Sequence, residues 1–239
     1  MSGPENVLIV GANRGIGFEL ATRFVKKGYN VWGTYRPQTR GDSSVSDLKG
    51  SGVHTIELDF TDEASINAAA QEYGNRPLGI LVNCAGVYHQ WDDKAFTELS
   101  AEDLMVHFKV NVVGPFLASK AFLPALERAG QGKIVNVSSD MASIADNTGG
   151  NACYRVSKAG VNQLTKTMAV DLAKLGSKVL ALAVHPGFVA TKMTGYFGKD
   201  DMDECMAALA DVIVRFGTAD GAAIPHGGYV RWNGDIMAY

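Results

Sequence analysis

The sequence predicts a single α/β domain in which helices cover both faces of a parallel β-sheet. Three observations support this prediction. The chain has 239 residues, a length that suits one α/β domain, and 46% of them are hydrophobic, enough to bury a full core. Short apolar runs typical of strands alternate with helical patterns, which is the order expected for a parallel sheet. No linker, internal repeat or low-complexity segment divides residues 1–239.

About seven strands are predicted, each a short apolar run bounded by glycine or polar residues. Their ranges are 7–10, 30–35, 53–58, 79–84, 133–137, 179–184 and 229–232. A long helix is expected over residues 100–126, with a local bend at Pro115. Residues 38–52, which are rich in Ser and Gly, are expected to form a loop with at most one helical turn. Thr61 is expected to cap the helix over residues 62–73.

Composition argues against several classes of protein. A net charge of −3 gives no reason to expect a nucleic-acid partner. No apolar stretch reaches the roughly 18 residues that a membrane span requires. Residues 1–6 lack the layout of a secretory signal, so a cytoplasmic location is expected. The three cysteines show no disulfide or ligand spacing, and His89 has no second ligand spaced with it, so no metal site is predicted.

A glycine-rich turn follows the first predicted strand and precedes a helix that runs to about Lys27. Backbone amides at such a helix N-terminus point outward, and the helix dipole favours phosphate. Glycines there let the backbone approach a pyrophosphate and let the helix pack close to the strand. The predicted dinucleotide-binding residues of this turn are Gly11, Asn13, Arg14, Gly15, Ile16 and Gly17, in G-x-x-x-G-x-G spacing.

The ends of the next strands suggest which dinucleotide binds. Arg36 lies just past the second strand, where an acid suits NAD and an arginine suits the 2′-phosphate of NADP, and no acid occurs there. Arg14 would add a second positive charge. Asp59, at the end of the third strand, either meets the adenine edge or caps its own loop, and the sequence does not favour one over the other.

The strongest chemical signal is the pair Tyr154 and Lys158, which a helix would place on one face, one turn apart. A nearby ammonium favours the phenolate and lowers the phenol pKa, which suits acid–base work near neutral pH. Ser138 and Ser139 end the fifth strand, at the sheet edge where ligands of open α/β sheets bind, and one hydroxyl could face the phenol. Asn111 lies among apolar residues, where its amide needs hydrogen-bond partners.

Two polar and aromatic segments are predicted to form the walls of a substrate pocket. The first is a loop over residues 87–98, and the second is a mobile lid at about 194–206, where glycine, aspartate and aromatic residues mix.

Together, these motifs resemble the short-chain dehydrogenase/reductase family, in the right order over essentially the whole chain. The resemblance implies a Rossmann-type fold and assigns roles to residues at matching positions. The catalytic set would be Asn111, Ser139, Tyr154 and Lys158, and the further cofactor-binding residues Asn83, Ala85, Gly86, Pro186, Gly187, Val189 and Thr191. The pattern Tyr-Arg-x-Ser-Lys, residues 146–150 and the closing Gly-Tyr-x-x-Trp look most similar to C-signal and sniffer-type carbonyl reductases.

Three departures from the family pattern stand out. Val10 occupies a place where the family usually has Thr, and Cys84 replaces the commoner second Asn. The interval from Ser139 to Tyr154 is two residues longer than usual, which leaves the serine register open between Ser138 and Ser139. Ser139 is preferred because it lies further past the strand.

The resemblance implies an NADPH-dependent reductase of a small carbonyl compound, a ketone or an aldehyde, with Tyr154 as proton donor. By analogy with the family, a homodimer or homotetramer is expected. Two alternatives stay open: a non-redox isomerase or cyclase that uses the same four residues, and a cofactor-sensing binding module. The sequence does not identify the substrate.

Overall fold

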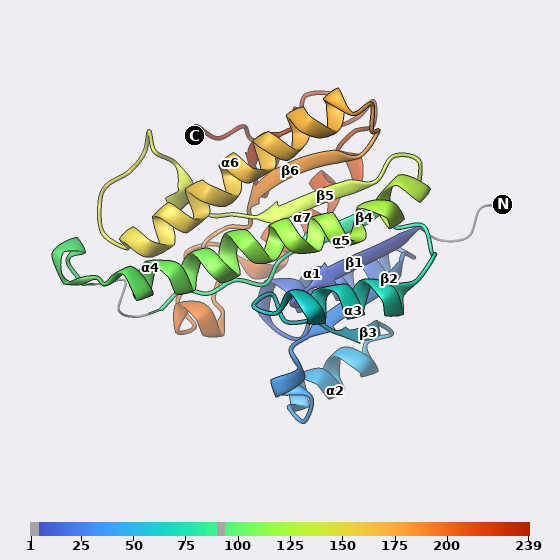
Figure 1. The fold of residues 1–239 in the computed structure, drawn as a ribbon, viewed down its shortest axis with the longest axis horizontal. Coiled ribbons are helices and arrows are strands. Elements are labelled where there is room, and N and C mark those ends of the chain that lie inside the picture. Colours follow the sequence, from blue (N-terminus) through green and yellow to red (C-terminus); the bar gives the residue numbers. More distant parts are fainter. Residues whose placement is uncertain (1–4, 90–93) are drawn as a thin grey trace.

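The computed structural model of the chain describes residues 5–89 and 94–239. A seven-stranded sheet runs through its centre in the order β3-β2-β1-β4-β5-β6-β7 (Figure 1). Every neighbouring pair of strands is parallel. The strands are β1 (Asn6–Val10), β2 (Asn30–Tyr35), β3 (His54–Glu57), β4 (Ile80–Asn83), β5 (Lys133–Val137), β6 (Leu180–His185) and β7 (Gly228–Arg231).

Helices cover both faces of this sheet, as the alternation of elements predicts. In Figure 1, α3, α5 and α6 lie in front of the sheet and α1 and α7 lie behind it. The long helices are α1 (Gly15–Lys26), α3 (Glu63–Tyr73), α4 (Ala101–Phe108), α5 (Gly114–Arg128), α6 (Ala152–Lys174) and α7 (Met202–Arg215). The predicted fold class, a single doubly wound α/β sheet, is confirmed.

The core is divided between the two faces because side chains alternate along each strand. From β1, Val7 and Ile9 join a cluster with the buried residues of α1 and α7. Leu8 and Val10 join the opposite cluster, with residues of α3, α5 and α6. Strands buried on both faces therefore appear in the sequence as continuous apolar runs.

The segment after β2 differs from the prediction. Residues 38–52 contain a short 3₁₀ turn, η1 (Pro37–Thr39), and a two-turn helix, α2 (Ser43–Gly50). Only Val45 and Leu48 of α2 are buried, so its apolar pattern is too sparse to stand out in the sequence. The cap of α3 also differs: Asp62, and not Thr61, is the N-cap, and its carboxylate accepts the amide of Ala64.

The predicted bend near Pro115 takes the form of a π-helical segment, η4 (Lys109–Val113), between α4 and α5. A π turn inserts one extra residue into the helical ladder and is frequent at functional sites. The α4–α5 unit is therefore one long helix with an interruption that contains Asn111.

The last strand is followed by a segment that folds back on the sheet, with Met237 donating its amide to the Tyr229 carbonyl.

Within the described ranges 5–89 and 94–239, no helix is both long and apolar enough to span a membrane.

Candidate active site

The carboxyl ends of the strands bring together residues that lie far apart in the sequence. The glycine turn leaves β1, Asn83 ends β4, the serine pair follows β5, and His185 ends β6. Because all strands are parallel, these ends share one edge of the sheet, where open α/β folds bind ligands.

The glycine turn is built so that side chains are excluded from it. A Cβ on Gly11, which has φ of +83°, would lie 2.8 Å from the Ala85 Cβ, and a Cβ on Gly17 would overlap the Gly11 carbonyl oxygen. The turn is tied to β2 by Thr34, whose hydroxyl accepts the Gly11 amide at 3.1 Å. Thr34 on β2 thus supplies a hydroxyl next to the turn, which the Val10 side chain lacks.

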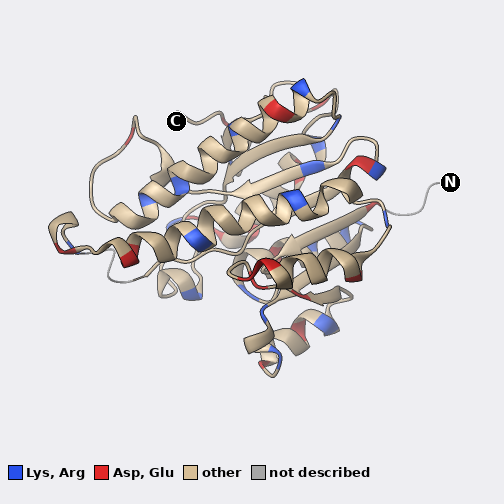
Figure 2. Ribbon diagram, viewed as in Figure 1, with Lys and Arg blue, Asp and Glu red and all other residues tan. Residues whose placement is uncertain are grey.

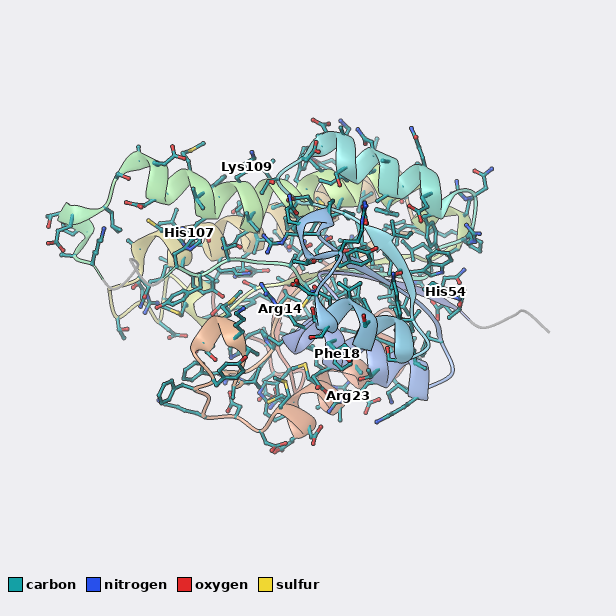
Figure 3. The ribbon with its side chains drawn as sticks, turned by 90° about the horizontal axis from the view of Figure 1, so that it is seen from below. Arg14, Phe18, Arg23, His54, His107 and Lys109 are labelled. Atoms are coloured by element: carbon teal, nitrogen blue, oxygen red, sulfur yellow. The ribbon has the colours of Figure 1, made fainter. Side chains whose placement is uncertain are left out.

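The other predicted residues of the turn lie at the start of α1. Arg14 is the exposed N-cap residue of that helix (Figure 3), and no side chain caps the helix there. Asn13 donates its side-chain amide to the Ser44 hydroxyl at 3.0 Å, which ties the turn to α2. Gly15, with φ of +54°, faces the Thr191 side chain, so the glycine turn and the segment after β6 are neighbours. A dinucleotide cradle requires this proximity.

Arg36 lies exposed just past β2, at the predicted ribose position, whereas its neighbour Arg40 is engaged. Arg40 forms an ion pair with Glu57, with contacts of 2.5 and 2.8 Å. Asp59 acts as a cap of its own loop: its carboxylate accepts the amide and the hydroxyl of Thr61 at 2.9 and 2.8 Å. Of the two roles left open for Asp59, the structure shows the capping one.

Burial opposes the ionisation of Asp59, but its pKa is nevertheless lowered. The hydrogen bonds from Thr61 and Gln38 and the charge of Arg36 outweigh the burial. Asp59 is thus an anchored carboxylate beside Arg36, in the region predicted to meet the adenosine.

Asn83 has its side chain inside the protein, and its contact with a cofactor stays a prediction. Its side chain is 1% exposed and donates to Ser119 on α5 and to Asn136 on β5, at 3.1 and 2.8 Å. Asn136 in turn donates to Thr165 on α6. The Asn83 side chain therefore joins sheet and helices from inside the protein. Ala85 packs on Gly11 of the turn, whereas Gly86 lies beside Asn111 and Lys158.

Tyr154 and Lys158 lie together as predicted, on the first two turns of α6. The Lys158 Nζ is 5.6 Å from the centre of the Tyr154 ring, within range of a cation–π contact. Lys158 is only 5% exposed and donates to the Val137 carbonyl at 2.8 Å. Because Tyr154 is in the first turn, the helix dipole adds to the positive potential at the phenol.

Burial lowers the pKa of Lys158 to about 8, against a partial opposing effect of Cys84. Burial likewise raises the pKa of the Cys84 thiol to about 12, so this cysteine stays protonated at neutral pH. A buried lysine whose pKa is lowered this far towards neutral pH is typical of a functional position.

Asn111 connects the π-helical segment to the loop after β4. Its Oδ1 accepts the Val87 amide at 2.9 Å, and its Nδ2 donates to the Val87 carbonyl at 3.0 Å and to the Ser157 hydroxyl at 3.0 Å. Gly86 lies beside it: a Cβ there would be 3.2 Å from the Asn111 Oδ1 and 3.5 Å from the Lys158 Nζ. Asn111 and Lys158 thus flank the same glycine.

The two serines face different surroundings. Ser138 is 2% exposed, and its hydroxyl is directed to the Lys158 carbonyl at 3.5 Å, inside the layer between sheet and α6. Ser139 is 8% exposed and begins the 3₁₀ turn η5 (Asp140–Ala142), where its hydroxyl donates to Asp140 at 3.0 Å and accepts the Met141 amide at 3.2 Å. Of the two hydroxyls, that of Ser139 lies further along the sheet edge.

The segment after β6 is anchored against Cys205 of α7, on the side away from the glycine turn. Pro186 and Gly187 are buried, and a Cβ on Gly187 would lie 2.9 Å from the Cys205 sulfur. Val189 is also buried, so its side chain serves the core and only its backbone can contact a ligand. Phe188 and Asp200 close the base of the loop through a hydrogen bond of 2.6 Å from the Phe188 amide to the Asp200 carboxylate.

The predicted lid at about 194–206 is only partly a loop. A 3₁₀ turn, η6 (Lys192–Thr194), precedes it, and its last five residues begin α7, with Cys205 and Met206 buried. The part outside regular structure carries the exposed side chains of Tyr196 and Phe197. Its mobility stays a prediction.

Three further residues, to which the sequence analysis assigns no individual role, also lie at the site. Tyr88 packs edge-on against Tyr154, with ring centres 5.1 Å apart, and donates to the Asn151 side chain at 2.6 Å. Asn151, which precedes α6, has φ of 51°, a conformation that Asn tolerates better than most residues. Ser157 links Asn111 to the Tyr154 carbonyl. Of the predicted pocket loop at residues 87–98, residues 90–93 lie outside the described residues, and Phe96–Glu98 form a 3₁₀ turn, η3.

Known proteins share this architecture. The family model for the short chain dehydrogenases matches residues 5–202. Galactitol 2-dehydrogenase (L-tagatose-forming) of Cereibacter sphaeroides is 36% identical over 187 residues, which cover 78% of this chain and 72% of that protein. The 3-oxoacyl-[acyl-carrier-protein] reductase FabG of Aquifex aeolicus is 34% identical over 221 residues, with 90% and 86% coverage.

Solved structures agree. The NADPH-bound carbonyl reductase from chicken fatty liver has a TM-score of 0.86 at 28% identity and covers 100% of both chains. The carbonyl reductase Sniffer of D. melanogaster has a TM-score of 0.87 at 26% identity, covering 99% of this chain and 100% of its own. Fold and matches together place the chain among the dinucleotide-dependent oxidoreductases. Within that class, it belongs to the short-chain dehydrogenase/reductase family.

Members of this family use nicotinamide cofactors on small-molecule substrates, and this site fits such a cofactor. The turn at residues 11–17 has no room for side chains at Gly11 and Gly17, which leaves its backbone free to approach phosphate. The turn faces Thr191. Among the residues that the structure describes, no cluster of His, Cys, Asp and Glu could hold a metal ion.

Proposed function

We propose that this protein reduces a ketone or aldehyde to an alcohol with NADPH as cofactor. The observation that carries the proposal is the buried Lys158 ammonium beside the Tyr154 ring, at the sheet edge that also carries the glycine turn. Two of the structural relatives are carbonyl reductases, which supports the reaction class.

In this proposal, residues along the sheet edge hold the cofactor. The amides of the turn at residues 11–17 bind the pyrophosphate, and Arg36 pairs with the 2′-phosphate. Lys158 holds ribose hydroxyls, and the backbone after Pro186, up to Thr191, borders the nicotinamide. When bound, reduced nicotinamide supplies a hydride to the carbonyl carbon.

Tyr154 donates the proton that the carbonyl oxygen needs as it becomes an alcohol. The Lys158 ammonium and the N-terminus of α6 both stabilise the phenolate that remains, so the phenol gives up its proton more readily than an isolated tyrosine. The Tyr88 ring packs at right angles to the phenol ring and restricts its orientation.

Ser139 holds the substrate oxygen through its hydroxyl, which rotates from its present partner, Asp140, towards that oxygen. Asn111 acts as a positioning residue, because it fixes the backbone of Val87 and the Ser157 hydroxyl beneath Tyr154. The substrate oxygen therefore accepts two hydrogen bonds, one from Ser139 and one from Tyr154.

The preference for NADPH rests on charge. Arg36 is exposed and makes no ion pair among the residues that the structure describes, whereas Arg40 nearby is paired with Glu57. A structural relative from Burkholderia multivorans contains NADP, at 27% identity and a TM-score of 0.86. A phosphate contact with a guanidinium contributes about 1.5–3 kcal/mol.

The test is steady-state oxidation of NADPH by the purified protein with a panel of simple ketones and aldehydes, followed by identification of the alcohol. The proposal expects stoichiometric alcohol formation, and NADH used at least about tenfold less efficiently. An isomerase or cyclase would convert its substrate without net NADPH consumption, and a binding module would bind NADPH without turnover with any carbonyl compound. Either result would contradict the proposal.

A further inference from the structure

Asp140 places a carboxylate directly beside the proposed oxygen-binding hydroxyl. Its Oδ1 accepts the Ser139 hydroxyl at 3.0 Å and also the Met141 amide at 2.9 Å. The Met141 amide in turn donates to the Ser139 oxygen. The carboxylate is therefore held within the turn η5 while 54% of its side-chain surface faces solvent.

A buried histidine from the next strand supports this turn. His185, at the end of β6, is 3% exposed and accepts the Asp140 amide through its Nδ1 at 3.0 Å. Burial lowers the pKa of His185, with the charge of Asp140 acting in the opposite direction, so the ring stays neutral and able to accept at neutral pH. The backbone of Asp140 is thus fixed at the same edge as the serine.

The other charges around the turn do not cancel this carboxylate. Asp200 and Arg231 act on His185 together with Asp140, and Asp146 and Arg231 act on the buried phenol of Tyr229. Three carboxylates thus face one guanidinium. A second guanidinium, that of Arg155, also contacts this turn: its Nη1 donates to the Met141 carbonyl at 3.5 Å, and its Nε donates to the carbonyls of Gly149 and Gly150 at 3.2 and 3.0 Å. Three carboxylates therefore still outnumber two guanidiniums.

We propose that Asp140 determines substrate specificity by disfavouring carbonyl compounds that carry a negative charge near the reacting group, so that the enzyme selects neutral and cationic ketones and aldehydes. This inference rests on the proposed function. A substrate oxygen bound to Ser139 lies two hydrogen-bond lengths from the Asp140 carboxylate, and a substrate anion a few ångströms further still feels its charge. Two like charges about 11 Å apart at a protein surface change kcat/KM by roughly tenfold.

The test compares 4-carboxybenzaldehyde with its methyl ester, which share a ring and an aldehyde but differ in charge. The ratio of their kcat/KM values is measured with NADPH for the wild type, Asp140→Asn and Asp146→Asn. Asparagine keeps an oxygen that can accept the Met141 amide. Asp146 is the matched control, because it lies in the same loop and its carboxylate accepts the Ser143 hydroxyl, not that of Ser139.

The expected result is a preference for the ester in the wild type, reduced about tenfold in Asp140→Asn and less than threefold in Asp146→Asn. The ratio removes any general loss of rate, since both aldehydes use the same hydroxyl and phenol. An unchanged ratio in Asp140→Asn, or an equal change in both variants, would overturn the role of Asp140 alone. If the wild type reduced neither aldehyde nor any other carbonyl compound, the proposed function would be contradicted. The inference about Asp140 would then be contradicted too, because it rests on that function.

Discussion

The difference in free energy of unfolding between Lys158→Met and the wild type should favour the variant more at pH 7 than at pH 9. In the folded protein, burial lowers the Lys158 pKa from 10.5 to about 8. A shift of this size corresponds to about 3 kcal/mol of unfavourable free energy while the lysine is protonated in both states. Methionine fills similar space without a charge, so it removes this cost.

The direction of this pH dependence follows from the number of protons that the folded and unfolded states bind. Between the folded and unfolded pKa values, the unfolded chain holds a proton on Lys158 that the folded protein has released, so wild-type stability rises with pH. Below the folded pKa the full cost is present, and near the unfolded pKa it has gone. The advantage of Lys158→Met should therefore shrink by about 1.3 kcal/mol from pH 7 to pH 9. The Val137 carbonyl loses its donor in the variant, which costs about 1–3 kcal/mol at both pH values.

Urea unfolding of the cofactor-free proteins at the two pH values measures this difference, and groups that titrate identically in both proteins cancel. Lys120→Met on α5 is the control, because Lys120 is exposed and its replacement should give the same difference at both pH values. A Lys158→Met advantage that is constant within about 0.5 kcal/mol would refute the assignment of a low pKa to Lys158.

Three further predictions concern the site. Ser139→Ala should lower turnover by roughly 10²–10³-fold and Ser138→Ala far less; kcat values in the reverse order would show that Ser138 holds the substrate oxygen. Arg36→Ala should erase most of the preference for NADPH over NADH by weakening NADPH use. Arg40→Ala removes a guanidinium that is paired with Glu57 and should leave this preference in place. An equal ratio of the kcat/KM values for NADPH and NADH in the two variants would contradict the role of Arg36. Gly17→Ala should cost about 1–3 kcal/mol of stability and weaken NADPH binding, because its Cβ would overlap the Gly11 carbonyl oxygen; native urea stability together with a native Kd would show that the turn tolerates a side chain.

Much of the fold could be predicted because its signals are local. In the strand Lys133–Val137, Ile134, Val135 and Val137 supply a short β-branched apolar run, and the structure reproduces its predicted bounds. The spacing of Tyr154 and Lys158 also predicts their contact, since helical geometry alone places them together. In contrast, α2 has only two buried residues, so no periodicity distinguished it from a loop.

The parts of the site that could not be predicted depend on pairing between distant segments. The hydrogen bond between Tyr88 and Asn151 joins residues 63 apart, and the one between Asp140 and His185 joins residues 45 apart. The sequence places Asn83 before Ala85 and Gly86 but does not show that strand pairing sets it opposite Asn136. No local pattern records such neighbours.

The central claim is that Tyr154 supplies the proton for carbonyl reduction, and one comparison tests it most directly. Tyr154→Phe and Tyr88→Phe each remove one phenolic hydroxyl from the same pair of packed rings. NADPH binding and the rate of aldehyde reduction are measured for both. Tyr154→Phe should bind NADPH with little change and lose at least about 10²-fold in kcat, while Tyr88→Phe, which loses its bond to Asn151, should keep most of its rate. Near wild-type turnover in Tyr154→Phe would contradict the account.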